Sequence, residues 1–328
     1  MDDKSTQQPY DNLTPDVMLD ALESIGYEVS GSLFALNSYE NRVYQVGLND
    51  GTDIIAKFYR PARWSDEAIL EEHAFSQELA DNEIPVVAPL AIKGKTLFFY
   101  EGYRFAVFRK HGGRGPELDN PEHLKWLGRF MGRIHAVGRT KSFQFRHKLT
   151  PEYLGEKSVA FLLTSDFIPE YLQHNYQVAA EAIMQVINNQ FEACMPFSIR
   201  IHGDCHPGNI LWTDDGPHFV DLDDTCMGPA IQDLWMLLSG DAGQMSTQLL
   251  TVLEGYGTFC EFDITELGLI EPLRALRQLH YSAWLARRWD DPAFPLHFPW
   301  FNTPRYWEEH INDLREIQER LDAPVLTL

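Results

Sequence analysis

Cysteine is scarce in this sequence, and the few cysteines are widely spaced. Four occur in 328 residues, and none belongs to a Cys-x-x-Cys pair. Without such pairs, neither a zinc ribbon nor a disulfide framework is indicated. Cys205 lies in a polar segment interpreted below as a catalytic loop, where an inert thiol and a redox-sensitive one are both conceivable. We interpret it as inert.

Basic residues and long apolar runs are also in short supply. The chain has 27 Lys and Arg against 48 Asp and Glu, a formal net charge of −21. Such a chain is repelled by phosphate backbones and anionic lipids, so we expect neither nucleic acid nor membrane partners. No uncharged apolar run approaches the roughly 20 residues that span a bilayer, and the N-terminal segment lacks the apolar core of a signal peptide. We therefore expect a cytoplasmic protein.

What the sequence does contain is enough apolar material for a filled core. Hydrophobic residues make up 44% of the chain and eight are Trp, so the chain is expected to be globular. Its length suits two lobes. We predict an α+β fold of two lobes, with an antiparallel-sheet N-lobe over 1–108, a hinge over 109–115 and a mainly helical C-lobe over 116–328.

The most informative stretch runs from Ile199 to Asp224 and reads IRIHGDCHPGNILWTDDGPHFVDLDD. Two short apolar runs, 210–212 and 218–220, flank the turn Thr-Asp-Asp-Gly at 213–216, which predicts a β-hairpin. Asp204 and Asn209 precede this hairpin, and Asp221 follows it. A catalytic Asp, an Asn five residues later and a metal-binding Asp after the next hairpin are typical of protein kinases.

These residue types suit phosphoryl transfer. Asp204 is predicted to accept the proton of the attacking hydroxyl, while Asn209 and Asp221 supply the hard oxygen ligands that Mg²⁺ prefers. Two other interpretations are weaker. A solvated loop rich in Asp and His is one. A dinuclear metallophosphoesterase is the other, but the N-terminal half has no Asp-x-His pair to complete its metal site.

The N-terminal half is predicted to begin with a helix and a strand meander. Thr14-Pro15-Asp16 is a helix start. Strands are expected over 32–36, 42–48 and 52–58, and then over 85–91, 96–100 and 103–108.

Lys57 stands inside the third of these strands, in the apolar run Ile-Ile-Ala-Lys-Phe. A Lys in such a strand matches the kinase residue that pairs the phosphates of ATP. Its carboxylate partner is expected on a helix over 65–82. Glu71 and Glu72 are both candidates there, and we prefer Glu72 because it shares a helix face with Phe75 and Leu79.

The loop 37–41 joins the first two strands, where a kinase has its glycine-rich phosphate lid, yet it contains no glycine. Asn37 and Ser38 offer donors that suit phosphate, although an ordinary turn explains the segment as well. In the segment 108–115, Phe108 to Lys110 are expected to offer backbone groups to an adenine.

Helices are predicted from Asn120-Pro121 onward, across 151–194 and over 229–238. Asp233 in the last of these is interpreted as structural, hydrogen-bonding the catalytic loop. The aromatic and proline-rich loop 291–304 suits either the wall of an acceptor site or simple packing against the C-terminal helix.

Several collinear strings resemble the aminoglycoside phosphotransferase and choline kinase branch of the kinase-like fold, and most closely its bacterial stress response kinases. The strings are LNSYENRVYQ, KFYRPARW, ILEEH, HGDCHPGNILW, FVDLDD, GPAIQDLWMLLSGD and DPAFPLHFPWF. The resemblance implies a monomeric, Mg²⁺- and ATP-dependent serine/threonine protein kinase of the bacterial cytoplasm. It also implies that Ser38 is an ATP-site residue, that Asp204 is the proton acceptor, and that Asn209 and Asp221 are magnesium ligands. Asp223 and Asp224 match the family strings without an assigned role.

We therefore expect protein serine and threonine hydroxyls as acceptors, including some on the kinase itself. A small-molecule phosphotransferase of the same fold, acting on an amino alcohol, a sugar or an aminoglycoside, is the alternative. A catalytically silent nucleotide-binding scaffold is a third hypothesis. The complete set of Lys57, Asp204, Asn209 and Asp221 argues against it.

Overall fold

A computed structural model of the chain describes residues 8–321, and these form two compact units. Unit 1 contains the residues up to Gly115 together with Ile210–Asp223. Unit 2 contains Pro116–Asn209 and the residues from Asp224 onward. Among the described residues, no helix is long and apolar enough to cross a membrane.

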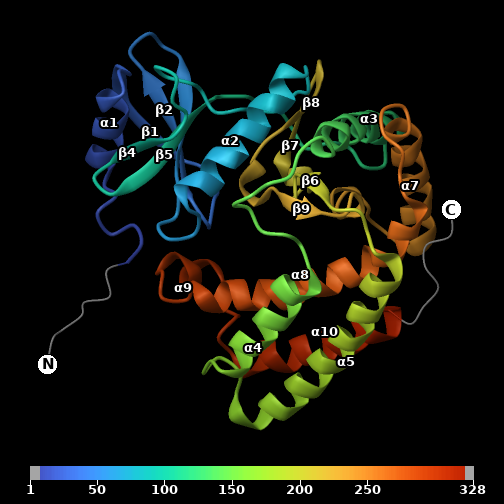
Figure 1. The fold of residues 1–328 in the computed structure, drawn as a ribbon. Coiled ribbons are helices and arrows are strands. Elements are labelled where there is room, and N and C mark those ends of the chain that lie inside the picture. The colour runs from blue at the N-terminus through green and yellow to red at the C-terminus, as the bar shows by residue number, and fades with distance from the viewer. Residues whose placement is uncertain (1–7, 322–328) are drawn as a thin grey trace, which may run out of the picture. The chain divides into compact units, whose positions relative to one another are not determined.

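Unit 1 is built on an antiparallel sheet of five strands, in the order β1-β2-β3-β5-β4 (Figure 1). The strands are β1 (Val29–Ala35), β2 (Arg42–Leu48), β3 (Asp53–Phe58), β4 (Phe98–Tyr100) and β5 (Tyr103–Arg109). Two helices accompany it, α1 (Pro15–Ser24) and α2 (Asp66–Asp81). The predicted N-cap of α1 is present, because the hydroxyl of Thr14 accepts a backbone N–H of the first turn, and the hydroxyl of Ser65 caps α2 in the same way.

The two faces of this sheet pack against different helices. Because side chains alternate along a strand, Ile54, Ala56 and Phe58 of β3 share one face, and they join the core that also contains α1. Lys57 points to the other face. There its register partner Ala106 packs with Ile69 of α2. The alternation therefore turns the one charged side chain of this apolar run toward α2.

The predicted hairpin is confirmed as β7 (Ile210–Thr213) and β8 (Gly216–Phe219). It belongs to unit 1, whereas the predicted division placed it in the helical C-lobe. Backbone hydrogen bonds explain the grouping: Phe219 bonds to Pro85 and Val87, and Trp212 bonds twice to Arg114.

The predicted strand over 85–91 was wrong. Only single bridges form there, from Val86 to Phe219 and from Pro89 to Phe108. Proline has no N–H to donate to a sheet, so Pro85 and Pro89 interrupt the pairing.

Unit 2 is mainly helical, and its elements follow the order of the chain. Its helices are α3 (Pro121–Gly138), α4 (Lys157–Leu163), α5 (Glu170–Cys194), α6 (Ile231–Trp235), α7 (Ala242–Tyr256), α8 (Ile270–Arg287), α9 (Ala293–His297) and α10 (Pro304–Leu321). Its short elements are η1 (Glu152–Glu156), β6 (Ile199–Ile201), η2 (Pro207–Asn209), β9 (Cys226–Gly228) and η4 (Ile264–Leu269), and η3 (Leu222–Asp224) lies at the boundary of the units. The predicted α+β class, with an antiparallel-sheet part and a mainly helical part, is confirmed.

Two packing arrangements organise unit 2. Helices α3 and α7 approach so closely that a Cβ at Gly128 would lie 2.0 Å from the carbonyl oxygen of Val252, so only glycine fits there. Helices α4, α5, α8 and α10 enclose an aromatic core. Phe294 and Phe301 of the segment 291–304 are fully buried in this core, and Phe301 packs 5.6 Å from Trp307 of α10. The predicted packing against the C-terminal helix is therefore confirmed for Phe301, whereas the ring of Phe294 contacts Trp284 of α8.

Candidate functional site

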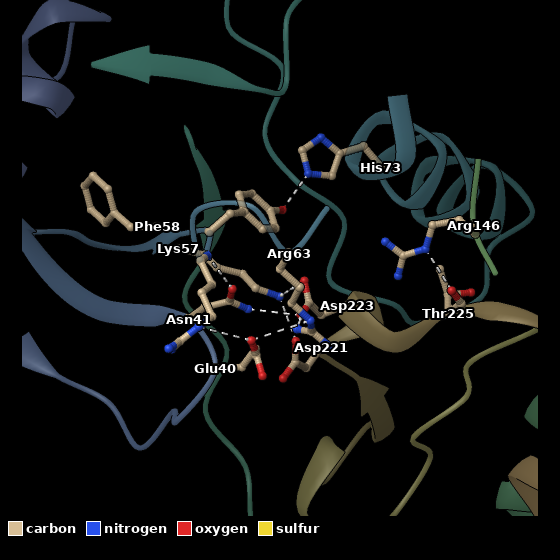
Figure 2. Close-up of polar contacts among 12 residues, drawn as sticks. Glu40, Asn41, Lys57, Phe58, Arg63, His73, Arg146, Asp221, Asp223 and Thr225 are labelled. Carbon is tan, nitrogen blue, oxygen red and sulfur yellow. Dashed lines mark hydrogen bonds and ion pairs between the residues drawn. The ribbon is translucent and has the colours of Figure 1, made fainter. Parts of the chain in front are cut away.

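Lys57 is buried and pairs with carboxylates that follow the hairpin. Its Nζ lies 2.7 Å from Oδ1 of Asp221 and 3.4 Å from Oδ1 of Asp223 (Figure 2). Burial would lower the pKa of Lys57, but the charges of Asp221, Asp223 and Glu72 outweigh it and raise that pKa above its usual value. Lys57 is therefore held as a cation inside unit 1.

Glu72, the preferred partner of Lys57, lies on the buried side of α2, whereas Glu71 is partly exposed. Its charge helps to raise the pKa of Lys57. The short ion pairs of Lys57, however, go to Asp221 and Asp223. Glu72 thus contributes to the electrostatic environment of Lys57, and its function as the phosphate-site partner stays a prediction.

Asp221 adopts a backbone conformation that is unusual for a residue other than glycine. Its φ is +59°, in the left-handed region, where a side chain costs about 1–2 kcal/mol. Non-glycine residues held in this region are concentrated at functional sites. The side chain is 51% exposed, and only Oδ1 is engaged by Lys57. The other carboxylate oxygen is therefore suited to bind a cation.

Asp223, which had no predicted role, is the buried centre of a polar cluster. Its Oδ2 accepts a hydrogen bond of 3.1 Å from Nδ2 of Asn41 and an ion pair from Nη1 of Arg63, both drawn in Figure 2. Arg63 also lies 3.7 Å from Oε1 of Glu40. Nothing in the sequence pattern links these positions, because more than 150 residues separate Arg63 from Asp223.

This cluster anchors one end of the loop 37–41. Asn41 is buried, and besides bonding Asp223 it accepts the backbone N–H of Arg60 at 3.1 Å. Ser38, three residues earlier, is only partly buried. The loop that lacks glycine is thus held by side chains at Glu40 and Asn41, while Ser38 stays accessible. The ATP-site role of Ser38 stays a prediction.

In unit 2, the predicted catalytic loop, from His202 to Asn209, is held by hydrogen bonds to its backbone. Nδ2 of Asn209 donates to the carbonyl of Asp204 at 2.9 Å, so the loop brings these two predicted residues together. Gly203 has a φ of +85°, and a Cβ there would lie 2.2 Å from the carbonyl oxygen of Asp224. Glycine is therefore required immediately before Asp204.

Asp233 of α6 carries out the structural task expected of it. Its carboxylate is fully buried and accepts the backbone N–H groups of His202 and Gly203, both at 2.8 Å. Nε2 of His135 lies 3.0 Å away. Burial alone would raise the pKa of Asp233, but the hydrogen bond from His135, its charge and the other donors lower it. The predicted hydrogen bonding of the catalytic loop by Asp233 is confirmed.

The carboxylate of Asp204 has a cationic neighbour that the sequence analysis missed. Nη1 of Arg277, on α8, lies 2.8 Å from Oδ1 of Asp204. Nε2 of His206 lies 3.6 Å from Oδ2. The side chain of Asp204 is 22% exposed, so it is not sealed in the core. No short motif signals Arg277, because it belongs to an amphipathic helix far along the chain.

Cys205 follows Asp204 but points into the core. It is fully buried, with Sγ 3.7 Å from Sδ of Met131. Burial and the charges of Asp233 and Asp204 raise the pKa of this thiol well above its usual value. Because the thiolate is the reactive form, the arrangement supports the inert interpretation.

The predicted magnesium ligands have suitable donor atoms. The amide nitrogen of Asn209 is engaged by the carbonyl of Asp204, which leaves the amide oxygen to act as a ligand. Asp221 offers a charged oxygen, and Mg²⁺ prefers such hard ligands. Asn209 belongs to unit 2 and Asp221 to unit 1, and each fits the ion by its own chemistry.

Comparison with known proteins agrees with these features. The model of a family described as "Phosphotransferase enzyme family" matches residues 34–270. Stress response kinase A of Escherichia coli (strain K12) is 45% identical over 320 residues, covering 97% of each chain. Serine/threonine protein kinase RdoA of Salmonella typhimurium (strain LT2) shows the same identity and coverage.

A solved structure shares the fold at much lower identity. An amicoumacin kinase in complex with AMP-PNP, Ca²⁺ and Ami aligns with a TM-score of 0.72 and 19% identity, covering 95% of this chain and 94% of that one. At this identity the likeness establishes the fold alone. The family match and the curated relatives carry the conclusion: this chain belongs to the phosphotransferase enzyme family, and it is a phosphotransferase with a protein-kinase-like fold.

Proposed function

We propose that this chain is an ATP- and Mg²⁺-dependent serine/threonine protein kinase that acts in the stress response of the bacterial cytoplasm. The observation that carries the proposal is the identity of 45%, over 97% of the chain, to a relative named a serine/threonine protein kinase. A second relative of equal identity is named stress response kinase A, and this name supports the proposed role in the stress response.

Asp204 is the proposed proton acceptor. In the transfer, the oxygen of a serine or threonine hydroxyl forms a bond to the γ-phosphorus of ATP, and the bond from that phosphorus to the leaving oxygen of ADP breaks. The hydroxyl proton passes to the carboxylate of Asp204. Support comes from the partial exposure of this carboxylate and from Asp233, which holds the preceding backbone in place.

Lys57 is the proposed phosphate ligand of unit 1. It is a buried cation, and its carboxylate partners hold it in its charged form. On ATP binding, we expect Lys57 to turn from Asp221 toward the α- and β-phosphates, while Glu72 continues to stabilise its charge. Ser38 is proposed to add a hydroxyl contact to the nucleotide.

Asn209 and Asp221 are the proposed ligands of Mg²⁺. The ion would neutralise charge on the phosphate oxygens, which is the main electrostatic demand of phosphoryl transfer. Freed from Lys57, Asp221 would have both carboxylate oxygens available for this task.

The proposed partners are proteins that carry serine or threonine acceptors, including the kinase itself. The net charge of −21 supports the exclusion of nucleic acid and anionic membranes as partners. We propose that the protein acts as a monomer.

A small-molecule acceptor is the second candidate. It is favoured by the fold likeness to an amicoumacin kinase, whose acceptor is a small molecule. Such a kinase needs a closed pocket with a few fixed polar groups, whereas a protein kinase needs an open platform beside Asp204.

The two candidates are separated by one transfer experiment. Purified protein is incubated with labelled ATP and Mg²⁺, with generic proteins in one arm and a panel of small hydroxyl compounds in the other. We expect acid-stable label on serine and threonine, lost in Asp204→Asn and kept in Asp214→Asn, an exposed turn residue of the hairpin. Label that enters a small compound and never protein would favour the second candidate.

A further inference from the structure

Arg277 is the feature of unit 2 that the proposed chemistry does not require. It places a guanidinium nitrogen 2.8 Å from Oδ1 of Asp204, on the carboxylate that is the proposed proton acceptor. A base that only removes a proton gains nothing from a cation at this position. The contact therefore needs a second explanation.

Arg274, on the same helix, is a structural arginine with which Arg277 can be compared. Arg274 lies one turn earlier, pairs with Glu271 at 2.6 Å and places its guanidinium 5.3 Å from the ring of Trp235. Arg277 differs in its exposure and in its partner, because 47% of its side chain is exposed, against 26% for Arg274, and its ion pair goes to Asp204 rather than to a residue of its own helix. A guanidinium has five N–H donors in a planar fork that matches a carboxylate. Arg277 is thus equipped to bind a second anion.

The same face of α8 continues from Arg277 as an aromatic and basic strip. Tyr281 and Trp284 follow at spacings of four and three residues, which keeps them on one side of the helix, and Arg288 is the C-cap residue that comes directly after α8. The rings of Tyr281 and Trp284 stack at 5.7 Å, and the guanidinium of Arg288 lies 5.3 Å from the ring of Trp284. Tyr281 is 39% exposed. We call these four residues the α8 strip.

The α8 strip differs in charge from the rest of the chain. Two of its four residues are cationic and none is acidic, on a protein with a net charge of −21. It begins at the proposed catalytic base through the Arg277–Asp204 pair. Its chemistry is complementary to an extended segment that carries carboxylates near its hydroxyl. A basic segment would meet repulsion at Arg277 and Arg288.

We propose that Arg277 is a specificity-determining residue that selects serine and threonine acceptors flanked by Asp or Glu, which dock along the α8 strip. The inference rests on the proposed protein kinase function. Without acceptor, Arg277 pairs with Asp204. A carboxylate of the acceptor takes over the guanidinium, and Oδ1 of Asp204 becomes available to the hydroxyl. The same exchange of ion pairs therefore recognises the acidic acceptor and frees Asp204 from Arg277.

The test uses three peptides that share one acceptor serine and differ only in the flanking residues, which are Glu, Gln or Lys. The readout is the ratio of kcat/KM between peptides within one enzyme variant. Any general effect of a substitution on Asp204 cancels in that ratio. For the wild type we expect the Glu peptide to exceed the Gln peptide about tenfold, as a partly exposed charge-assisted hydrogen bond implies.

Arg277→Gln should bring the ratio of Glu to Gln peptides to about one, and Arg277→Glu should favour the Lys peptide. Arg305→Gln is the matched control, because it removes an equally charged residue that pairs with Glu309 on α10. Its ratio should equal that of the wild type. Tyr281→Ala should raise KM for all three peptides without changing their ratio.

The outcomes separate the inference from the function on which it rests. Equal labelling of the three peptides by the wild type, or an unchanged ratio in Arg277→Gln, overturns the selection of acidic acceptors while leaving a protein kinase. If no peptide or protein is labelled and a small hydroxyl compound is, both the proposed function and this inference fail.

Discussion

Asp223 and Asp233 are both buried aspartates, yet their partners differ in kind. In unit 1, Asp223 is held by the side chains of Lys57, Arg63 and Asn41. In unit 2, Asp233 is held mainly by backbone N–H groups of the catalytic loop. Long cationic side chains can exchange one anion for another, whereas backbone donors are fixed by the fold. The ion pairs of unit 1 can therefore be exchanged, as the proposed binding of phosphate and metal requires, whereas the hydrogen bonds of Asp233 hold the backbone in a fixed position.

The largest expected effect comes from the exposed carboxylate of unit 1. Asp221→Ala should lower metal-dependent ATP turnover by roughly 10³-fold or more, because a catalytic metal supplies several kcal/mol of charge stabilisation. The free energy of unfolding should change by only about 1 kcal/mol, since Asp221 is half exposed and Lys57 keeps Asp223. Turnover is measured with a coupled ATPase assay and stability by urea unfolding. Near-normal turnover would contradict the metal-binding role, and Asp214→Ala is the control.

The second prediction contrasts the two buried aspartates directly. Asp233→Ala should cost about 3 kcal/mol or more of unfolding free energy, because two buried N–H groups lose their acceptor. Asp223→Ala should cost less, about 1–2 kcal/mol, because the Asn41 amide loses its acceptor while Lys57 keeps Asp221 and Arg63 keeps Glu40. Urea unfolding of both variants measures the difference. Equal losses would mean that the two clusters are equally rigid.

The third prediction concerns the support of Asp233. Glu266 accepts the backbone N–H of Ile231, the first residue of α6, at 2.9 Å. Burial raises its pKa to about 7 from 4.5, with Asp263 adding to the rise and Arg139 and the backbone donors opposing it. A carboxyl with a raised pKa stabilises the fold below its unfolded pKa and loses that contribution as the pH rises through the folded pKa.

Between pH 4.5 and 7, the wild type should therefore lose up to about 3 kcal/mol of unfolding free energy relative to Glu266→Gln. The measurement is urea unfolding of both proteins across this range. Parallel curves would show that Glu266 titrates normally in the folded protein.

The smallest expected effect lies at the accessible end of the loop 37–41. Ser38→Ala should weaken ATP use by about 0.5–1.5 kcal/mol, the typical contribution of one neutral hydrogen bond. The KM for ATP measures it, with Ser32→Ala on the exposed part of β1 as the control. A fully inactive Ser38→Ala would mean that this serine does more than contact the nucleotide.

Local chemistry was readable from the chain because it depends on residues close in sequence. The N-caps at Thr14 and Asn120 were predicted and are present, since capping needs only the next few residues. The hairpin over 210–219 was predicted for the same reason.

Predictions failed where distant pairing decides the outcome. The apolar segment 85–91 suggested a strand. Its two prolines have no N–H to donate, and only single bridges form there. The helix predicted over 229–238 is shorter, α6 (Ile231–Trp235), and the strand predicted over 32–36 begins earlier, at Val29.

The sequence by itself determined the kinase-like order of Lys57, Asp204, Asn209 and Asp221, because that spacing is a property of consecutive residues. Only the tertiary structure decided which charges meet. Asp223 contacts Asn41 and Arg63, and Asp204 contacts Arg277. These residues are far apart in the sequence, and no periodic pattern of the chain predicts that they meet. An ion pair depends on distance in space, which many different sequence separations can satisfy, so the pairing had to be observed in the fold.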